Sequence, residues 1–241
     1  MIEFQKIHKN YHLSGQNVHE ALKGVHGVIN RGEIIALFGP SGSGKSSLLN
    51  ICSLLDSNYN GRVIIDGEAI TKTPEFALDI RRKKIGLIYP GFSLVTAYTV
   101  FENIEFPLVL SHIPDAIRRD RVTAMMSTLE LDKYKDDRPE QLTEGLKRRV
   151  LVARAFINQP VAVFADEPVA DLDSRDAASL IEMIKRIGKE TGSSVLIATC
   201  DSDLAVSCGR IIHLQNGNIV EHVPRASIQR SKVSEALPWG I

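Results

Sequence analysis

The sequence predicts an α/β fold in which a parallel β-sheet forms the core, antiparallel strands flank it and a helical segment is inserted. Short continuous apolar runs at 33–38, 160–166 and 193–200 are typical of buried parallel strands. A helical pattern at 179–190 separates the last two runs, which gives the order strand, crossover helix, strand. The 241 residues, 44% of them hydrophobic, can bury such a core without disulfides or metals.

The first part of the chain predicts strands, a loop and a helix in that order. Residues 2–12 and 18–30 alternate between apolar and polar side chains, as antiparallel strands do. The apolar run 33–38 is followed by a glycine-rich loop and then by an apolar helix that begins near Lys45. A strand, a glycine loop and a helix form the opening unit of a parallel sheet.

The later part of the chain predicts a helical insertion, a hairpin and a tail. Residues from about 90 to 158 are mostly helical in pattern and are punctuated by Pro107, Pro114 and Pro139. Asn216 and Gly217 stand between two apolar stretches, which is a strong hairpin signal. We therefore expect one domain over 1–225, with a helical subdomain at 90–158, and a loosely held C-terminal tail over 226–241.

Charge and cysteine content exclude several classes of protein. Lys plus Arg and Asp plus Glu both number 29, so no global positive field favours nucleic acid, and we expect no nucleic-acid partner. Three cysteines without CxxC spacing argue against a disulfide framework or a zinc site and favour a reducing cytosol. The seven histidines show no metal-ligand spacing. Without an apolar run of sufficient length, we expect neither a membrane span nor an export signal.

The segment GPSGSGKSS fits the phosphate-loop pattern G-x-x-x-x-G-K-[ST] and stands between a predicted strand and a predicted helix. Its glycines let backbone N–H groups turn toward a phosphate chain, while Lys45 supplies a positive charge to the β- and γ-phosphates. Ser46 would hold Mg²⁺. The predicted phosphate-binding residues are Gly39, Pro40, Ser41, Gly42, Ser43, Gly44, Lys45, Ser46 and Ser47. The fold is therefore expected to contain a phosphate-loop NTPase core.

Two adjacent carboxylates, Asp166 and Glu167, end the apolar run 160–166. A parallel sheet brings such strand ends to the same edge as the phosphate loop. Asp166 is then suited to bind Mg²⁺ through water, and Glu167 is suited to polarise the water that attacks the γ-phosphate. An acidic pair at the end of a strand is by itself more often a turn or a helix cap, and the phosphate loop is what favours catalysis here.

Together these motifs resemble the ATP-binding subunits of ABC transporters over nearly the whole chain. GPSGSGKSS resembles their phosphate loop, LTEGLKRRVLVARAF (142–156) their LSGGQ signature helix, and FADEPVADLD (164–173) their second nucleotide motif and D-loop. Tyr11 lies where this family places an aromatic residue that stacks on adenine. The segment 85–108 is similar to the subgroup that serves lipoprotein-release and macrolide-export permeases, of the LolD and MacB type.

The resemblance implies an ABC ATPase fold and a composite active site. Each nucleotide would lie between the phosphate loop of one subunit and the signature segment of another, where Thr143, Glu144 and Gly145 face the partner's nucleotide. The implied cofactors are ATP and Mg²⁺. The implied partners are transmembrane permease subunits, reached through residues around 90–110, and a second ATP-binding subunit in a homodimer or a heterodimer. The implied location is peripheral, at the cytoplasmic face of the inner membrane.

Several positions depart from the family pattern. Pro90 stands where the family has a glutamine that touches Mg²⁺ and the attacking water, and Cys200 stands where it has a histidine that reaches the γ-phosphate. In the signature, Thr143 keeps the hydroxyl of the usual serine and Gly145 is retained, whereas Glu144 replaces a glycine and brings negative charge toward the phosphates. Leu146 replaces the signature glutamine. These departures predict that ATP binds and is hydrolysed slowly.

Two interpretations are favoured, and two others are weighed against them. The chain is either a driving subunit with reduced hydrolysis or a slow or non-hydrolysing, regulatory or structural ATP-binding member of a heteromeric ABC complex. A soluble ABC ATPase of DNA repair or translation would need coiled coils, zinc insertions or a second ATPase unit, for which 241 residues leave no room. A phosphate-loop GTPase would need an NKxD-like segment, which the sequence lacks.

Overall fold

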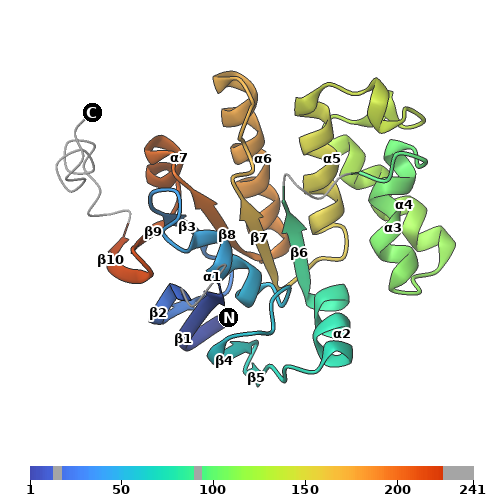
Figure 1. Ribbon diagram of the computed structural model, residues 1–241. Helices are drawn as coiled ribbons and strands as arrows, with labels where there is room; N and C mark the ends of the chain where they lie inside the picture. Colours follow the sequence, from blue (N-terminus) through green and yellow to red (C-terminus); the bar gives the residue numbers. More distant parts are fainter. Residues whose placement is uncertain (13–17, 90–93, 225–241) are drawn as a thin grey trace.

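A six-stranded sheet forms the centre of the computed structural model, which describes residues 1–12, 18–89 and 94–224 (Figure 1). Its strand order is β10-β9-β3-β8-β7-β6, with parallel pairing throughout except between β9 and β10. The strands are β3 (Ile34–Phe38), β6 (Ile85–Ile88), β7 (Ala162–Asp166), β8 (Ser194–Thr199), β9 (Arg210–Gln215) and β10 (Asn218–Pro224). The three apolar runs of the sequence are thus confirmed as neighbouring parallel strands.

The central strand β3 is buried along its whole length because both faces of the sheet are covered. Ile34, Ala36 and Phe38 belong to one apolar core, which the later helices complete. Ile35 and Leu37 belong to a second core, which lies between the sheet, the first helix and a separate antiparallel sheet. Side chains that alternate between two cores explain why the sequence shows a continuous apolar run here instead of an alternating pattern.

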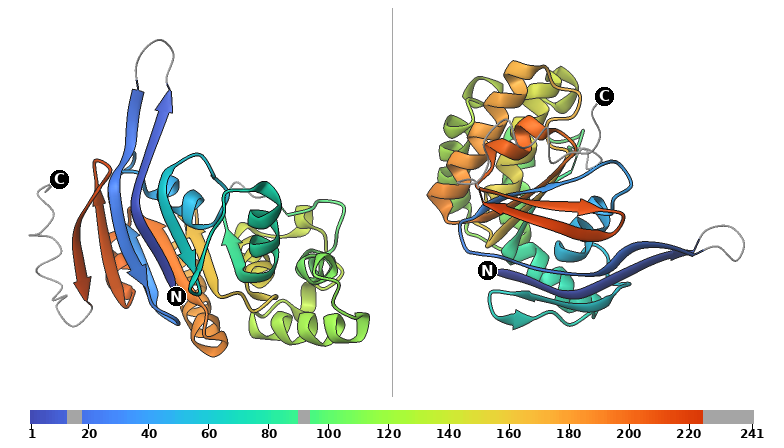
Figure 2. Two further views of the ribbon diagram at one scale, coloured as in Figure 1. Left: turned by 90° about the horizontal axis from the view of Figure 1, so that it is seen from below. Right: turned by 90° about the vertical axis from the view of Figure 1, so that its left-hand side faces the viewer.

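The antiparallel sheet has the order β2-β1-β4-β5 and confirms the flanking strands. Its strands are β1 (Ile2–His12), β2 (Val18–Ile29), β4 (Asn60–Ile65) and β5 (Glu68–Ala69). The first two form a long hairpin that extends beyond the rest of the molecule (Figure 2). Register shifts interrupt the pairing of β1 with β2, one of them next to Lys6, which has a positive φ of 49°. The sequence analysis did not predict β4 or β5.

The helices surround the central sheet. They are α1 (Lys45–Cys52), α2 (Pro74–Lys84), α3 (Val100–Leu110), α4 (Asp115–Thr128), α5 (Glu144–Phe156), α6 (Ser174–Thr191) and α7 (Ser202–Ser207), with 3₁₀ turns η1 (Asp132–Tyr134) and η2 (Pro139–Gln141). In Figure 1 the helices α3 to α5 gather beside β6, at the opposite end of the sheet from the β9–β10 hairpin. None of the helices in the described part of the chain is long and apolar enough to cross a bilayer.

The helical segment predicted at 90–158 is present over its described residues, from 94 onward. Pro114 and Pro139 stand at helix starts, as expected, but Pro107 lies inside α3 and does not end it. A Thr99–Glu102 capping box fixes the start of α3. Asn103 is fully buried in α3, accepts a hydrogen bond from the backbone N–H of Val95 at 2.8 Å and donates one to its carbonyl at 3.1 Å. The expected tail, 226–241, lies outside the described residues.

Candidate functional site

The glycine-rich loop joins the end of β3 to the start of α1, as predicted. Two of its glycines lie too close to neighbouring backbone for any side chain. A Cβ on Gly39 would lie 2.1 Å from the carbonyl oxygen of Leu214, and a Cβ on Gly44 would lie 2.5 Å from that of Ala21. Gly44 also has a φ of 107° and caps α1. These glycines therefore let the loop pack closely between the β1–β2 and β9–β10 hairpins.

Lys45 is folded back over this loop. Its ammonium donates to the carbonyl oxygens of Gly39 at 2.7 Å and Pro40 at 3.0 Å, and its side chain is 7% exposed. The hydroxyl of Ser43 is buried and has no hydrogen-bond partner among the described residues. Lys45 lines the cavity beside the loop, and a buried ammonium there is suited to an anionic group with several acceptor oxygens, as a phosphate has.

The carboxylates Asp166 and Glu167 lie at the end of β7. Glu167 has a φ of 42°, and its carboxylate accepts hydrogen bonds from Thr199 Oγ1 at 3.1 Å and from the N–H of Cys200 at 2.9 Å. No side chain in the described ranges makes a hydrogen bond or an ion pair with Asp166. A carboxylate beside the phosphate loop, with no cationic partner in this part of the chain, offers the oxygen ligand that Mg²⁺ prefers, and Ser46 is the second candidate ligand.

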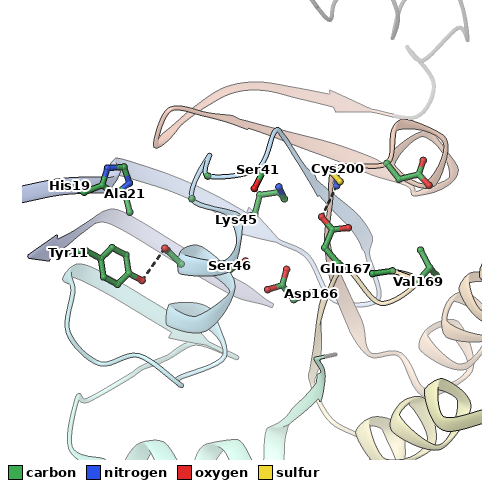
Figure 3. A pocket seen from close by; sticks show the side chains of 15 residues that line it. Tyr11, His19, Ala21, Ser41, Lys45, Ser46, Asp166, Glu167, Val169 and Cys200 are labelled. Carbon is green, nitrogen blue, oxygen red and sulfur yellow. Dashed lines mark hydrogen bonds between the residues drawn. The ribbon is translucent and has the colours of Figure 1, made fainter. Parts of the chain in front are cut away.

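A cavity of about 590 Å³ connects these groups (Figure 3). Tyr11 lies at one end, the phosphate loop with Lys45 and Ser46 in the middle, and Asp166 and Glu167 toward the other end. The Tyr11 hydroxyl is hydrogen bonded to that of Ser47 at 3.2 Å, and the Lys9 ammonium lies 4.8 Å from the centre of the Tyr11 ring. The lining residues are Tyr11, His19, Ala21, Ser41, Gly42, Gly44, Lys45, Ser46, Ser47, Asp166, Glu167, Val169, Ala170, Cys200 and Asp201.

The signature residues lie at the start of α5 and do not line this cavity. Thr143 is the N-cap of α5 and accepts a hydrogen bond from the N–H of Leu146 at 3.4 Å. Glu144 is exposed and pairs with Lys147 at 2.7 Å, and this hydrogen bond lowers the pKa of the Glu144 carboxyl. A Cβ on Gly145 would lie 2.8 Å from Asp176 Oδ2. The structure thus separates these residues from the phosphate loop of their own chain.

Of the two departures at Pro90 and Cys200, the structure describes Cys200. Cys200 is exposed at the end of β8 and lines the cavity beside Glu167. Although the residue is exposed, partial removal of its thiol from water and the neighbouring Glu167 carboxylate raise the pKa of the Cys200 thiol. Pro90 lies outside the described residues.

Several residues of the cavity were not found by sequence analysis. His19 and Ala21 come from β2, and Val169, Ala170 and Asp201 come from the segments after β7 and β8. Thr199, which is fully buried, was also missed, although it contacts Glu167 directly. The alternation of apolar and polar residues in 18–30 predicted a strand. The register shifts between β1 and β2 change which side chains face the phosphate loop, so the alternation alone did not identify them. Val169 and Ala170 lie within the FADEPVADLD stretch but were not assigned to the site, and no short motif marks His19, Ala21 or Thr199.

A parallel sheet with a phosphate loop after one strand and a carboxylate at the end of another defines a phosphate-loop nucleotide-binding protein. Within that class, residues 22–170 match the model of the family described as "ABC transporter", and the chain belongs to this family. By this membership it is an ATP-binding subunit of the ABC transporter type. The expected ABC ATPase fold and the resemblance to LolD-type and MacB-type subunits are confirmed by the relatives below.

Three relatives show the range of this likeness. The chain is 34% identical over 222 residues to the methionine import ATP-binding protein MetN 1 of Staphylococcus aureus, covering 92% of this chain and 65% of that protein. It is 34% identical to the lipoprotein-releasing system ATP-binding protein LolD 1 of Rhodopseudomonas palustris, covering 91% and 98%. It is 33% identical to the macrolide export ATP-binding/permease protein MacB of Syntrophobacter fumaroxidans, covering 99% and 33%. The chain thus spans less than two thirds of MetN 1 and one third of MacB.

A solved structure supports the fold. The ATP-binding cassette MJ0796 of Methanocaldococcus jannaschii, in a dimeric post-hydrolysis state bound to ADP and Pi, superposes with a TM-score of 0.85. The sequences are 33% identical, and the match covers 95% of this chain and all of that one.

Proposed function

We propose that this chain binds Mg-ATP, dimerises around it and drives a membrane permease while hydrolysing ATP slowly. The observation that carries the proposal is the order of groups along one cavity: an aromatic ring, the phosphate loop with Lys45, and then two carboxylates. A nucleoside triphosphate presents a base, a phosphate chain and a metal-binding end in the same order. The relatives are named as ATP-binding proteins, which supports this ligand.

Each group in the cavity has a role in this proposal. Tyr11 stacks on the base, and the N–H groups from Gly39 to Ser47 hold the phosphates together with Lys45. Asp166 and Ser46 hold Mg²⁺, which when bound neutralises charge on the β- and γ-phosphates. Glu167 orients the attacking water and accepts its proton. The ammonium of Lys45 exchanges its two carbonyl acceptors for phosphate oxygens when the nucleotide enters.

Dimerisation follows from the position of the signature segment. Because Thr143, Glu144 and Gly145 do not line the cavity of their own chain, they are available to the nucleotide of a second subunit. The dimeric MJ0796 structure supports such an arrangement. Either a second copy or a different ATP-binding subunit can take the partner's place. A permease partner and a peripheral position at the cytoplasmic face of the inner membrane agree with relatives named as transporter components.

A slow or non-hydrolysing, regulatory or structural ATP-binding member of a heteromeric complex is the second candidate. The observation that favours it is Glu144, whose exposed carboxylate would approach the partner's γ-phosphate in a closed dimer. Cys200 adds to this, because a thiol is too short and too weak a donor to replace an imidazole at the γ-phosphate. Glu167 argues against a complete loss of hydrolysis.

Titration calorimetry with Mg-ATP on the wild type and on Lys45→Ala tests the proposal. We expect the wild type to bind ATP and Lys45→Ala to bind it far more weakly, because the substitution removes the buried ammonium beside the loop. Lys23→Ala is a matched control that removes a cation from β2 at a position outside the cavity. Equal ATP affinity for wild type and Lys45→Ala would refute the proposed function.

A further inference from the structure

We infer that His19 forms the second wall of the nucleobase site, beside Tyr11. This inference rests on the proposed function, because it assigns a residue to the same nucleotide site. The base site would then consist of two rings, Tyr11 on β1 and His19 on β2. The family resemblance implies only the Tyr11 ring. The ligand is the base of a nucleoside triphosphate.

The pairing of β1 with β2 places the two rings together. Tyr11 and His19 are directly opposed in the antiparallel register. Side chains of directly opposed residues project from the same face of a sheet, with Cβ atoms ~4.5–5.5 Å apart. Both side chains line the cavity, and Figure 3 shows them at the same end of it, on the far side of the phosphate loop from Glu167.

The path of β2 fixes how far His19 lies from the phosphates. Ala21 also lines the cavity, and its carbonyl oxygen lies 2.5 Å from the position of a Cβ on Gly44, so β2 passes directly over the start of α1. A strand rises by ~3.4 Å per residue, which places His19 ~7 Å farther along the strand than this contact. In a bound nucleotide the ribose lies between the phosphates and the base, so a base would extend from the phosphate loop along β2 toward His19. The base therefore reaches the rings while the phosphates remain on the loop.

Tyr11 is anchored, whereas His19 is free to bind a ligand. The hydrogen bond to Ser47 and the nearby Lys9 ammonium hold the tyrosine ring in place. His19 is exposed and makes no hydrogen bond or ion pair within the described ranges, unlike His8, which lies 3.4 Å from Glu20. An imidazole presents an aromatic face and two ring nitrogens, which match the face and the polar edge of a base.

Calorimetry on the full chain with two probes, Mg-ATP and Mg-tripolyphosphate, separates base contacts from phosphate contacts. We expect His19→Ala to weaken ATP binding ~5- to 10-fold, because a lost stacking contact has about this effect, and to leave tripolyphosphate binding unchanged. Tyr11→Ala should show the same split. His12→Ala is the matched control, because His12 is an exposed histidine on the same hairpin that does not line the cavity.

The outcomes are distinguishable. If His19→Ala binds ATP as the wild type does, or weakens ATP and tripolyphosphate equally, the inference is wrong and the proposed function stands. If the wild type binds neither probe, the proposed function fails and His19 has no base to contact. His19→Phe keeps a ring at this position, so retention of at least half the wild-type affinity would assign the contact to stacking. A loss equal to that of His19→Ala would assign it to the ring nitrogens.

Discussion

The main-chain N–H of Cys200 donates a hydrogen bond to Glu167 Oε1 at 2.9 Å. Residue 200 therefore holds the proposed catalytic carboxylate through its backbone, and this contact does not depend on the side chain. Thr199 Oγ1 holds the second oxygen at 3.1 Å. In the proposed function, the Cys200 side chain lacks the γ-phosphate donor that the resemblance implies for a histidine here, while the backbone contact to Glu167 is kept.

The first prediction concerns the rate of ATP hydrolysis. Restoring the family residues with Pro90→Gln, Glu144→Gly and Cys200→His together should raise turnover by ~10²-fold or more, since one lost donor to the transition state costs ~10²- to 10³-fold. Losses within one site need not add. The measurement is phosphate release from the purified dimer or the native complex, with Glu167→Gln as the inactive control. A wild type as fast as the restored variant would show that these departures do no damage.

The second prediction concerns the Cys200 thiol. Because its pKa is raised, little thiolate exists at neutral pH, and alkylation by iodoacetamide should be slower than for a free thiol. The rate should climb as pH rises toward the raised pKa. Cys52 and Cys208 are buried, and burial raises the pKa of Cys52 to about 12, so the exposed Cys200 should be the first of the three to react and Cys200→Ser should remove this first reaction. Mass spectrometry follows the reaction; a rate at neutral pH that matches a free thiol would contradict the prediction.

The third prediction compares two glycines that both have a positive φ. Gly44→Ala should lower the free energy of unfolding by about 3 kcal/mol, because it adds a clash with the Ala21 carbonyl to the strain of a positive φ. Gly32 has a φ of 72° but open space around it, so Gly32→Ala should cost only about 1 kcal/mol. Urea denaturation without nucleotide measures both. Equal losses would mean that the loop relaxes away from β2.

The fourth prediction concerns Asn103, the buried amide of α3. Its side chain bonds to both backbone groups of Val95 and donates to the carbonyls of Tyr98 and Thr99. Asn103→Ala should destabilise the protein by about 2 kcal/mol or more, because buried backbone groups lose their partners. Asn10→Ala, at an exposed position of β1, should change stability by less than about 0.5 kcal/mol. A similarly small effect at Asn103 would mean that water replaces the amide.

The fifth prediction concerns location. When the chain is produced together with its permease partner, we expect it to sediment with membranes. It should return to the supernatant when the permease is omitted, because in the proposed function the permease is what holds it at the membrane. Cell fractionation with immunoblotting measures the distribution. If the chain stays in the supernatant with the permease present, the soluble ABC ATPase alternative gains over the transporter subunit.

The sequence by itself determined the parts of this protein that depend on local order. The phosphate loop is read from consecutive residues, Gly39 to Ser47, because its function needs N–H groups that follow one another along the chain. The parallel strands are read from apolar runs, because strands covered on both faces have no polar side. Asp166 and Glu167 are found because they end such a run. Each of these signals lies within a few neighbouring positions.

The tertiary structure alone decided which distant residues meet. His19 reaches the cavity because the bulged register of β1 and β2 sets it opposite Tyr11, and a shift of one residue would turn it to the other face. Thr199 contacts Glu167 because β7 and β8 are paired in the sheet. Thr143, Glu144 and Gly145 lie outside their own chain's cavity because α5 stands apart from the phosphate loop. Such distances depend on the packing of whole elements, which no short stretch of sequence encodes.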